Sequence, residues 1–487
     1  MDVINADEKR MWREYCAVVQ LPMQMFLEIQ NTLLSEQLDL IRESDWFTAL
    51  VPGHMPKSVE EFRRNVPLRT WRDYVPILEP ETVNDLAEDL HCWVHTSWCR
   101  GTYKKVPWVR RFFDAQCRHI IAALMMSAAR FEGDVRLNKN FRVLPVLPET
   151  PFASAWLATG VIQRDIVDPL LALPVDGDEG TTMSERIQSG LRRSLGPGVD
   201  CVVGMSSTLL LARREFGRMV KKTSFRQLLF EVGTRAAMRW AWGNVRHVGK
   251  GKTWEPNALL KPKSVITWGA DTDFLTPTLE AQWGAPVFQI YASSEAGIIA
   301  MQDWRRNGLV PLPTSVFLEF LPADASPEND APVLLDALKD GELYEPVITS
   351  FYGMPFLRMR QGDLLRVEGR NEHGVPLLRF HSRADDIIDL GSIARIDTDT
   401  LAEAMEMVGV SRDDWDAKKE YVGNNVVMSL YVNMEPENVN DLRSRIDATL
   451  GKVDPHYREA RYTLRYPLIR VLATKRPPVP DATPSVQ

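Results

Sequence analysis

The chain has 487 residues, of which 45% are hydrophobic and 25% are charged, and its formal net charge is -7. This length exceeds what one hydrophobic core usually holds, so it predicts roughly two or three domains. The acidic balance does not suit a nucleic-acid partner. The apolar stretch 120–129 is only about half a membrane span, so we expect no membrane partner either.

The chain opens on a helical pattern. Apolar residues at helical spacing predict a helix over 7–45 with a break at Pro22, and further helices over 114–130 and 223–245. Short apolar runs predict strands at 202–206, 265–268, 287–291, 316–321 and 347–350. Because helices alternate with short apolar strands, we predict an α/β fold in which helices cover mostly parallel sheets.

A smaller α+β pattern starts after residue 382. It predicts strands at 386–390, 426–432 and 463–472, and helices at 398–407 and 436–450. We therefore predict a large N-terminal domain over 1–382, a small C-terminal domain over 383–475 and a proline-containing tail over 476–487.

The cysteines are few and far apart, at Cys16, Cys92, Cys99, Cys117 and Cys201. Their odd number and wide spacing predict neither a disulfide framework nor a metal cluster, but reduced thiols in a cytoplasmic protein. Acidic residues precede any apolar run at the start of the chain, which is not the pattern of a signal peptide.

Polar residues follow directly on the apolar strand at 286–290. They are Tyr291, Ser293, Ser294 and Glu295. A loop at the carboxyl end of a buried strand is where open α/β sheets bind ligands. A tyrosine ring suits a planar base, the serines present hydroxyls, and the glutamate offers a hard oxygen ligand for magnesium. An ordinary strand and turn is the alternative interpretation of this stretch by itself.

Three further motifs accompany this loop. A buried strand at 265–268 runs into the glycine turn Gly269–Ala270, Asp363 follows Gly362 in a turn between arginine-containing segments, and Arg383 precedes Asp385. Each motif alone also fits a hairpin or a salt-bridged loop. The four motifs in this order are more specific.

In this order the motifs resemble the adenylate-forming (acyl-CoA synthetase-like) ligase superfamily, in its phenylacetate-CoA ligase and auxin-amido synthetase-like branch. The resemblance covers nearly the whole chain and implies an adenylation domain over 1–382 and a small, mobile lid domain over 383–475. It also implies a reaction in which ATP, with Mg2+, and a small carboxylic acid form an acyl adenylate and pyrophosphate, after which a nucleophile displaces AMP.

The chemical identity of the nucleophile that displaces AMP stays open. Likeness to the phenylacetate branch favours a thiol such as coenzyme A, and an amine, which would give an amide, is the alternative. A third hypothesis is a protein that binds a nucleotide or an acyl adenylate and has lost ATP-dependent adenylation. The identity of the acid and the oligomeric state stay open as well.

The resemblance also implies roles for individual residues. Tyr291 would stack on adenine, Asp363 would hold the ribose hydroxyls, and Arg383 would assist catalysis at the ribose or phosphate. Glu295 would be a catalytic residue and the magnesium ligand, and Asp385 would lie at the hinge of the lid. The remaining residues of the nucleotide site would be Gly269, Ala270, Ser293 and Ser294.

The predicted phosphate loop lies within 95–108 and departs from the family pattern. Its matching residues are Thr96, Ser97, Gly101, Thr102 and a lysine, either Lys104 or Lys105. Trp98, Cys99 and Arg100 stand where glycine and threonine are expected, although Arg100 can pair with phosphate oxygens. The family's C-terminal catalytic lysine has Lys475 as its only nearby candidate, and the usual glycine loop is missing.

Overall fold

The computed structural model describes residues 6–42, 44–51, 56–78, 86–97, 103–164, 166–169, 183–222, 224–231, 233–247, 254–325, 331–384, 387–434 and 438–474. Contacts divide the chain into two units, and each is described by itself. The first comprises Met1–His95, Lys105–Trp268 and Thr272–Ala384. The second comprises Thr96–Lys104, Gly269–Asp271 and Asp385–Gln487.

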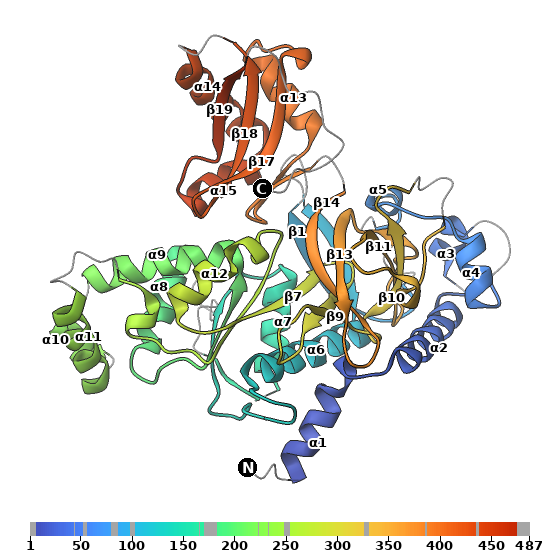
Figure 1. Ribbon diagram of the computed structural model, residues 1–487, viewed down its shortest axis with the longest axis horizontal. Coiled ribbons are helices and arrows are strands. Elements are labelled where there is room, and N and C mark those ends of the chain that lie inside the picture. The colour runs from blue at the N-terminus through green and yellow to red at the C-terminus, as the bar shows by residue number, and fades with distance from the viewer. Residues whose placement is uncertain are drawn as a thin grey trace. The chain divides into compact units, whose positions relative to one another are not determined.

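A twelve-stranded sheet runs through the first unit (Figure 1). One part of it is parallel, in the order β7-β6-β5-β3-β4. These strands are β3 (Arg142–Val146), β4 (Asp168–Pro169), β5 (Cys201–Met205), β6 (Ser264–Trp268) and β7 (Val287–Ser293). The strands predicted at 202–206, 265–268 and 287–291 are therefore confirmed to within about two residues.

Helices cover both faces of this parallel part. Val265 and Val287 pack in one cluster with α8 (Met183–Ser194), α9 (Ser206–Lys222) and α12 (Thr272–Trp283). The alternate residues Ile266 and Phe288 are equally buried, and because side chains alternate along a strand they point to the opposite face. There α6 (Arg110–Ala128) contacts β6, β7 and β8 and packs against α7 (Ala153–Ile162). The predicted α/β class is confirmed.

The rest of the sheet is antiparallel, so the prediction of a mostly parallel sheet holds only for the part described above. Its strands are β8 (Gly297–Gln302), β9 (Leu309–Pro311), β10 (Val316–Pro322), β11 (Leu343–Ser350), β12 (Met359–Arg360), β13 (Asp363–Arg370) and β14 (Pro376–Arg383). The connections 294–296 and 371–375 are too short for the crossover that parallel strands require, so each makes a hairpin. β1 (Leu90–Ser97) and β2 (Tyr103–Val109) form a separate two-stranded sheet.

Two predicted helices are each divided. The pattern over 7–45 forms α1 (Ala6–Tyr15), α2 (Met23–Ile41) and the start of α3 (Asp45–Leu50), with the expected break at Pro22, the N-cap residue of α2. The pattern over 223–245 forms α10 (Phe225–Glu231) and α11 (Thr234–His247). Gly233 lies between them with a φ of 99°, a left-handed conformation that ends a helix and favours glycine. No described helix is both long and apolar enough to cross a membrane.

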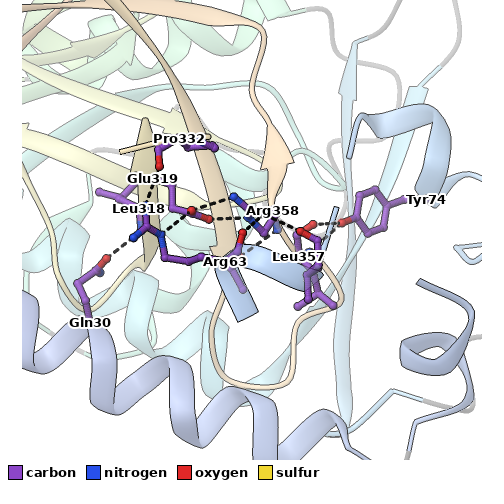
Figure 2. A network of polar contacts seen from close by, with 10 residues as sticks. Gln30, Arg63, Tyr74, Leu318, Glu319, Pro332, Leu357 and Arg358 are labelled. Carbon is purple, nitrogen blue, oxygen red and sulfur yellow. Dashed lines mark hydrogen bonds and ion pairs between the residues drawn. The ribbon is translucent and has the colours of Figure 1, made fainter. Parts of the chain in front are cut away.

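A buried polar network joins the N-terminal helices to the antiparallel strands (Figure 2). The Arg358 guanidinium makes two hydrogen bonds to the Glu319 carboxylate, at 2.8 and 3.0 Å, and both side chains are almost fully buried. Arg63 of α4 (Val59–Asn65) binds the same carboxylate at 2.9 Å. Tyr74 of α5 (Trp71–Tyr74) donates to the carbonyl of Leu357 at 2.6 Å. The segment leading into β12 is thereby held by contacts with α4, with α5 and with Glu319 of β10.

The second unit contains a three-stranded sheet, and its described helices and strands share one hydrophobic core. Its elements are β15 (Ile388–Leu390), β16 (Ala394–Ile396), α13 (Thr398–Met407), β17 (Trp415–Val422), β18 (Asn425–Asn433), α14 (Val439–Val453), α15 (Pro455–Leu464) and β19 (Ile469–Thr474). The prediction did not include β17 or α15, and the predicted start of the last strand at 463 is wrong because 463–464 complete α15. Asp454 caps α15 through its side chain, with Pro455 at the first position.

Candidate active site

Three of the predicted site residues meet at one carboxylate. The Tyr291 hydroxyl donates to Oδ2 of Asp363 at 2.9 Å, and Nη1 of Arg383 lies 2.7 Å from Oδ1 of the same side chain. Asp363 and Arg383 are 14% and 15% exposed, so their ion pair is largely shielded from water. This carboxylate is therefore held in one orientation by two donors.

The register of the sheet explains this meeting. Asp363 is the first residue of β13 and Arg383 is the last residue of β14, and the two are paired directly across the hairpin. Side chains opposite each other in such a pair lie close enough to interact. Tyr291 lies on β7 and is 72 residues from Asp363 in the sequence.

A second carboxylate holds the turn that precedes Asp363. Glu345 of β11 is 3% exposed, and it accepts from the Arg360 guanidinium at 2.6 Å and from the Gly362 amide at 2.9 Å. Arg360, the arginine of this motif, is thus paired with a carboxylate of the protein. Glu345 was missed in the sequence, although a charged residue inside an apolar strand was a usable signal.

Tyr291 remains protonated. Burial, and next the Asp363 carboxylate, raise the pKa of this phenol well above its ordinary value. Its hydroxyl is therefore a hydrogen-bond donor to Asp363 throughout the physiological pH range.

The serines and the glutamate of the motif lie in and beside the β7–β8 turn. Ser293 is the last residue of β7, and its hydroxyl accepts from the Ala296 amide at 3.2 Å. Ser294 and Glu295 lie in the turn itself and are 9% and 4% exposed. The turn is thus packed into the protein, in contrast to an ordinary surface hairpin.

Some of the other predicted site residues belong to the described part of the chain, and the rest lie outside it. Thr96 and Lys104 are half-buried at the ends of the β1–β2 hairpin and group with the second unit, as do Gly269 and Ala270. Ser97 is the last residue of β1. Trp98, Cys99, Arg100, Gly101, Thr102, Asp385 and Lys475 lie outside the described residues. Their roles stay predictions.

The described cysteines are not activated nucleophiles. Burial raises the pKa of Cys92 to about 12 and the pKa of both Cys117 and Cys201 to about 11. Within the described ranges, no three histidine, cysteine, aspartate or glutamate side chains are grouped to hold a metal ion.

His119 is a buried residue of α6 and gives a pH prediction. Its ring contacts the Gln116 carbonyl oxygen at 3.3 Å and the Thr314 hydroxyl at 3.0 Å, and burial lowers its pKa to about 4. Because the unfolded chain takes up this proton near pH 6.5, the stability that His119 contributes is present above that pH and is lost as the pH falls toward 4.

We expect wild type to lose about 2 kcal/mol more unfolding free energy between pH 7 and pH 5 than His119→Gln does. Urea unfolding of both proteins at each pH measures this difference. Parallel pH profiles of the two proteins would contradict the prediction.

Comparisons with known proteins concern the family and the fold. Residues 309–383, from β9 to β14, match the GH3 family central domain, and this segment carries Asp363 and Arg383. An 81-residue stretch is 36% identical to the 4-substituted benzoates-glutamate ligase GH3.12 of Arabidopsis thaliana. A 158-residue stretch is 31% identical to the probable indole-3-acetic acid-amido synthetase GH3.4 of Oryza sativa subsp. japonica. These stretches cover 17% and 30% of this chain, but only 13% and 24% of the relatives.

Solved structures share the fold along most of the chain. The acyl acid amido synthetase AtGH3.15 superposes with a TM-score of 0.58 and 16% identity, over 96% of this chain and 88% of that one. A 2-hydroxyisobutyryl-CoA ligase superposes with a TM-score of 0.57 and 15% identity, over 98% and 90%.

The fold is therefore that of the adenylate-forming ligases. Residues 309–383 match the GH3 family central domain, and a 158-residue stretch is similar to a probable indole-3-acetic acid-amido synthetase. The predicted resemblance is confirmed.

Proposed function

We propose that this chain is an ATP-dependent ligase that converts a carboxylic acid into an acyl adenylate and transfers the acyl group to the amino group of an amino acid. The observation that carries the proposal is the cluster of Tyr291, Asp363 and Arg383 around one carboxylate. The amine acceptor is supported by the two curated relatives, which are named as a glutamate ligase and an amido synthetase.

Asp363 suits a ribose. A carboxylate has about four lone-pair positions, and the Tyr291 hydroxyl and Arg383 each use one here. The remaining positions can accept from the two ribose hydroxyls without breaking either contact. Arg383 adds positive charge beside this carboxylate, which would attract the nucleotide phosphates.

The first step joins the acid to the nucleotide. A carboxylate oxygen of the acid attacks the α-phosphorus of ATP, and the bond to pyrophosphate breaks. Both reactants are anions, so the site must hold them in line and neutralise the developing charge. Glu295 would be the carboxylate that holds Mg2+, because magnesium is usually bound through one or two protein carboxylates plus substrate phosphates. When bound, the ion would neutralise phosphate charge.

Residues of the predicted phosphate loop would hold the leaving pyrophosphate. They are Thr96, Ser97, Arg100, Gly101, Thr102 and Lys104. Lys475 would contact the carboxylate of the acid, and Gly269 and Ala270 would border the base.

The second step releases AMP. The amine nitrogen attacks the acyl carbonyl, AMP departs with the electrons of the acyl–oxygen bond, and the nitrogen loses a proton. Coenzyme A is the second candidate acceptor, supported by the likeness in fold to a CoA ligase over 98% of this chain. With that acceptor a thiol sulfur attacks the same carbonyl.

The test is pyrophosphate release from ATP by the purified protein with a panel of aryl, fatty and indole carboxylic acids. Each acid is offered with amino acids, with coenzyme A and with neither, and the products are identified by mass. We expect one acid class to release pyrophosphate, with an amide as the product. Asp363→Asn and Glu295→Gln are each expected to lower the rate of release strongly.

Other outcomes decide between the alternatives. A thioester in place of the amide would make the chain a CoA ligase. If no acid releases pyrophosphate while acyl-adenylate mimics bind, the chain is a binding protein and the proposed reaction is wrong.

A further inference from the structure

The turn that carries Glu295 is held by side chains from four other parts of the first unit. The indole N–H of Trp108 donates to the Ser294 carbonyl at 2.7 Å. The Ser350 hydroxyl donates to the Glu295 carbonyl at 3.2 Å, and the Ser315 hydroxyl donates to the Ala296 carbonyl at 3.0 Å. All three consecutive carbonyls of the turn thus have a side-chain donor.

Gln116 of α6 holds the far side of this turn. Its amide nitrogen lies 3.4 Å from the Ala296 carbonyl, and its carbonyl oxygen accepts from the Ile298 amide at 2.8 Å. One side chain therefore bridges the last residue of the turn and the second residue of β8.

Gly297, between these two residues, leaves room for that bridge. A Cβ atom at this position would lie 2.1 Å from the Gln116 side chain, so glycine is required for the close approach. Its φ of 64° is also a left-handed conformation that favours glycine.

These donors are shut off from water. Trp108, Gln116, Ser315 and Ser350 all have 0% exposure. A buried carbonyl that loses its donor keeps the cost of desolvation, so each of these bonds strongly favours the observed orientation of its peptide group. The backbone on both sides of Glu295 is consequently rigid before any ligand binds.

We propose that Gln116, together with Trp108, Ser315 and Ser350, positions the Glu295 carboxylate for the magnesium–nucleotide complex. The inference rests on the proposed function. It assigns these four side chains as positioning residues, because they touch the backbone of the turn and act through Glu295. A carboxylate fixed in advance needs no reordering when the ion and the phosphates arrive.

Gln116→Met tests the proposal, because methionine has nearly the same shape and cannot accept from the Ile298 amide. We expect the affinity for MgATP, measured by calorimetry, to fall about tenfold, which corresponds to about 1.4 kcal/mol. In a Glu295→Gln background the same substitution should change the affinity by less than about twofold, since the group being positioned is already altered. Ser350→Ala, a smaller change, should show the same dependence on Glu295.

Gln37→Met is the matched control. Gln37 is also buried, accepts from the Gly353 amide at 2.7 Å and donates to the Met354 carbonyl at 2.8 Å, so these two bonds hold residues 353–354 and not the turn at Glu295. We expect it to lower the melting temperature as much as Gln116→Met does and to leave MgATP affinity unchanged.

The outcomes are distinguishable. If wild type binds MgATP and Gln116→Met weakens binding equally with and without Glu295, or Gln37→Met weakens it as much, the positioning role is wrong and the proposed function stands. If wild type binds no MgATP, the proposed function fails and the positioning role fails with it.

Discussion

Asp363→Asn is expected to lower kcat/KM for ATP in acid-dependent pyrophosphate release by about 100-fold or more. The loss of two hydrogen bonds from ribose hydroxyls to a charged acceptor, at about 1.5 kcal/mol each, accounts for this factor. Asparagine keeps the shape of the side chain but leaves Arg383 without its ion pair. Steady-state kinetics with varied ATP measures the effect.

Glu368→Gln is the control for this substitution. Glu368 lies on the same strand and forms an ion pair with Arg379 of β14 at 3.1 Å, so the chemical change and the pair of strands are alike. This pair is more exposed, and we expect kinetics within about twofold of wild type. A similar loss in both variants would mean that the hairpin, and not the Asp363 carboxylate, sets the rate.

Arg358→Met is expected to have the largest effect on stability, a loss of about 3–5 kcal/mol in the free energy of unfolding. Arg358 is 4% exposed, and its guanidinium forms hydrogen bonds with the Glu319 carboxylate (Figure 2). It also donates, at 2.6 Å each, to the carbonyls of Arg63 and Val66. Its removal leaves a buried carboxylate with Arg63 as its remaining ion-pair partner among the described residues. Denaturant unfolding followed by circular dichroism measures the loss.

The double variant Arg358→Met/Glu319→Leu separates charge from packing. If the cost comes from a buried carboxylate that has lost one of its two ion-pair partners, removing the carboxylate as well should restore part of the stability. A double variant less stable than Arg358→Met would show instead that the Glu319 carboxylate still stabilises the fold through Arg63.

The strands and their polar loops could be predicted because their signals are local. A run such as 287–291 is apolar over a few adjacent residues, and Tyr291, Ser293 and Glu295 follow it directly. The order of four such motifs was enough to indicate the class of fold. Local signals fail where packing against a distant segment decides the structure of a stretch. In α15 the arginines and an exposed tyrosine obscured the helical pattern, although the helix packs on the second unit's core.

The partners of the site could not be predicted in this way. Glu345 and Gln116 lie 17 and 182 residues from the groups that they hold, Gly362 and Ile298, and neither has a motif around it. The antiparallel part of the sheet was missed for a related reason, since strand direction depends on the connections and on which strands pair.

The sequence by itself determined many of the helices and strands, the glycine positions and the residues that carry charge and hydroxyls, because these follow from side chains within about one turn or one strand. Only the tertiary structure decided that Tyr291 and Arg383 would share the Asp363 carboxylate, and that four buried donors would hold the turn at Glu295. Those contacts depend on strand register and on burial, which arise from the packing of segments far apart in the chain.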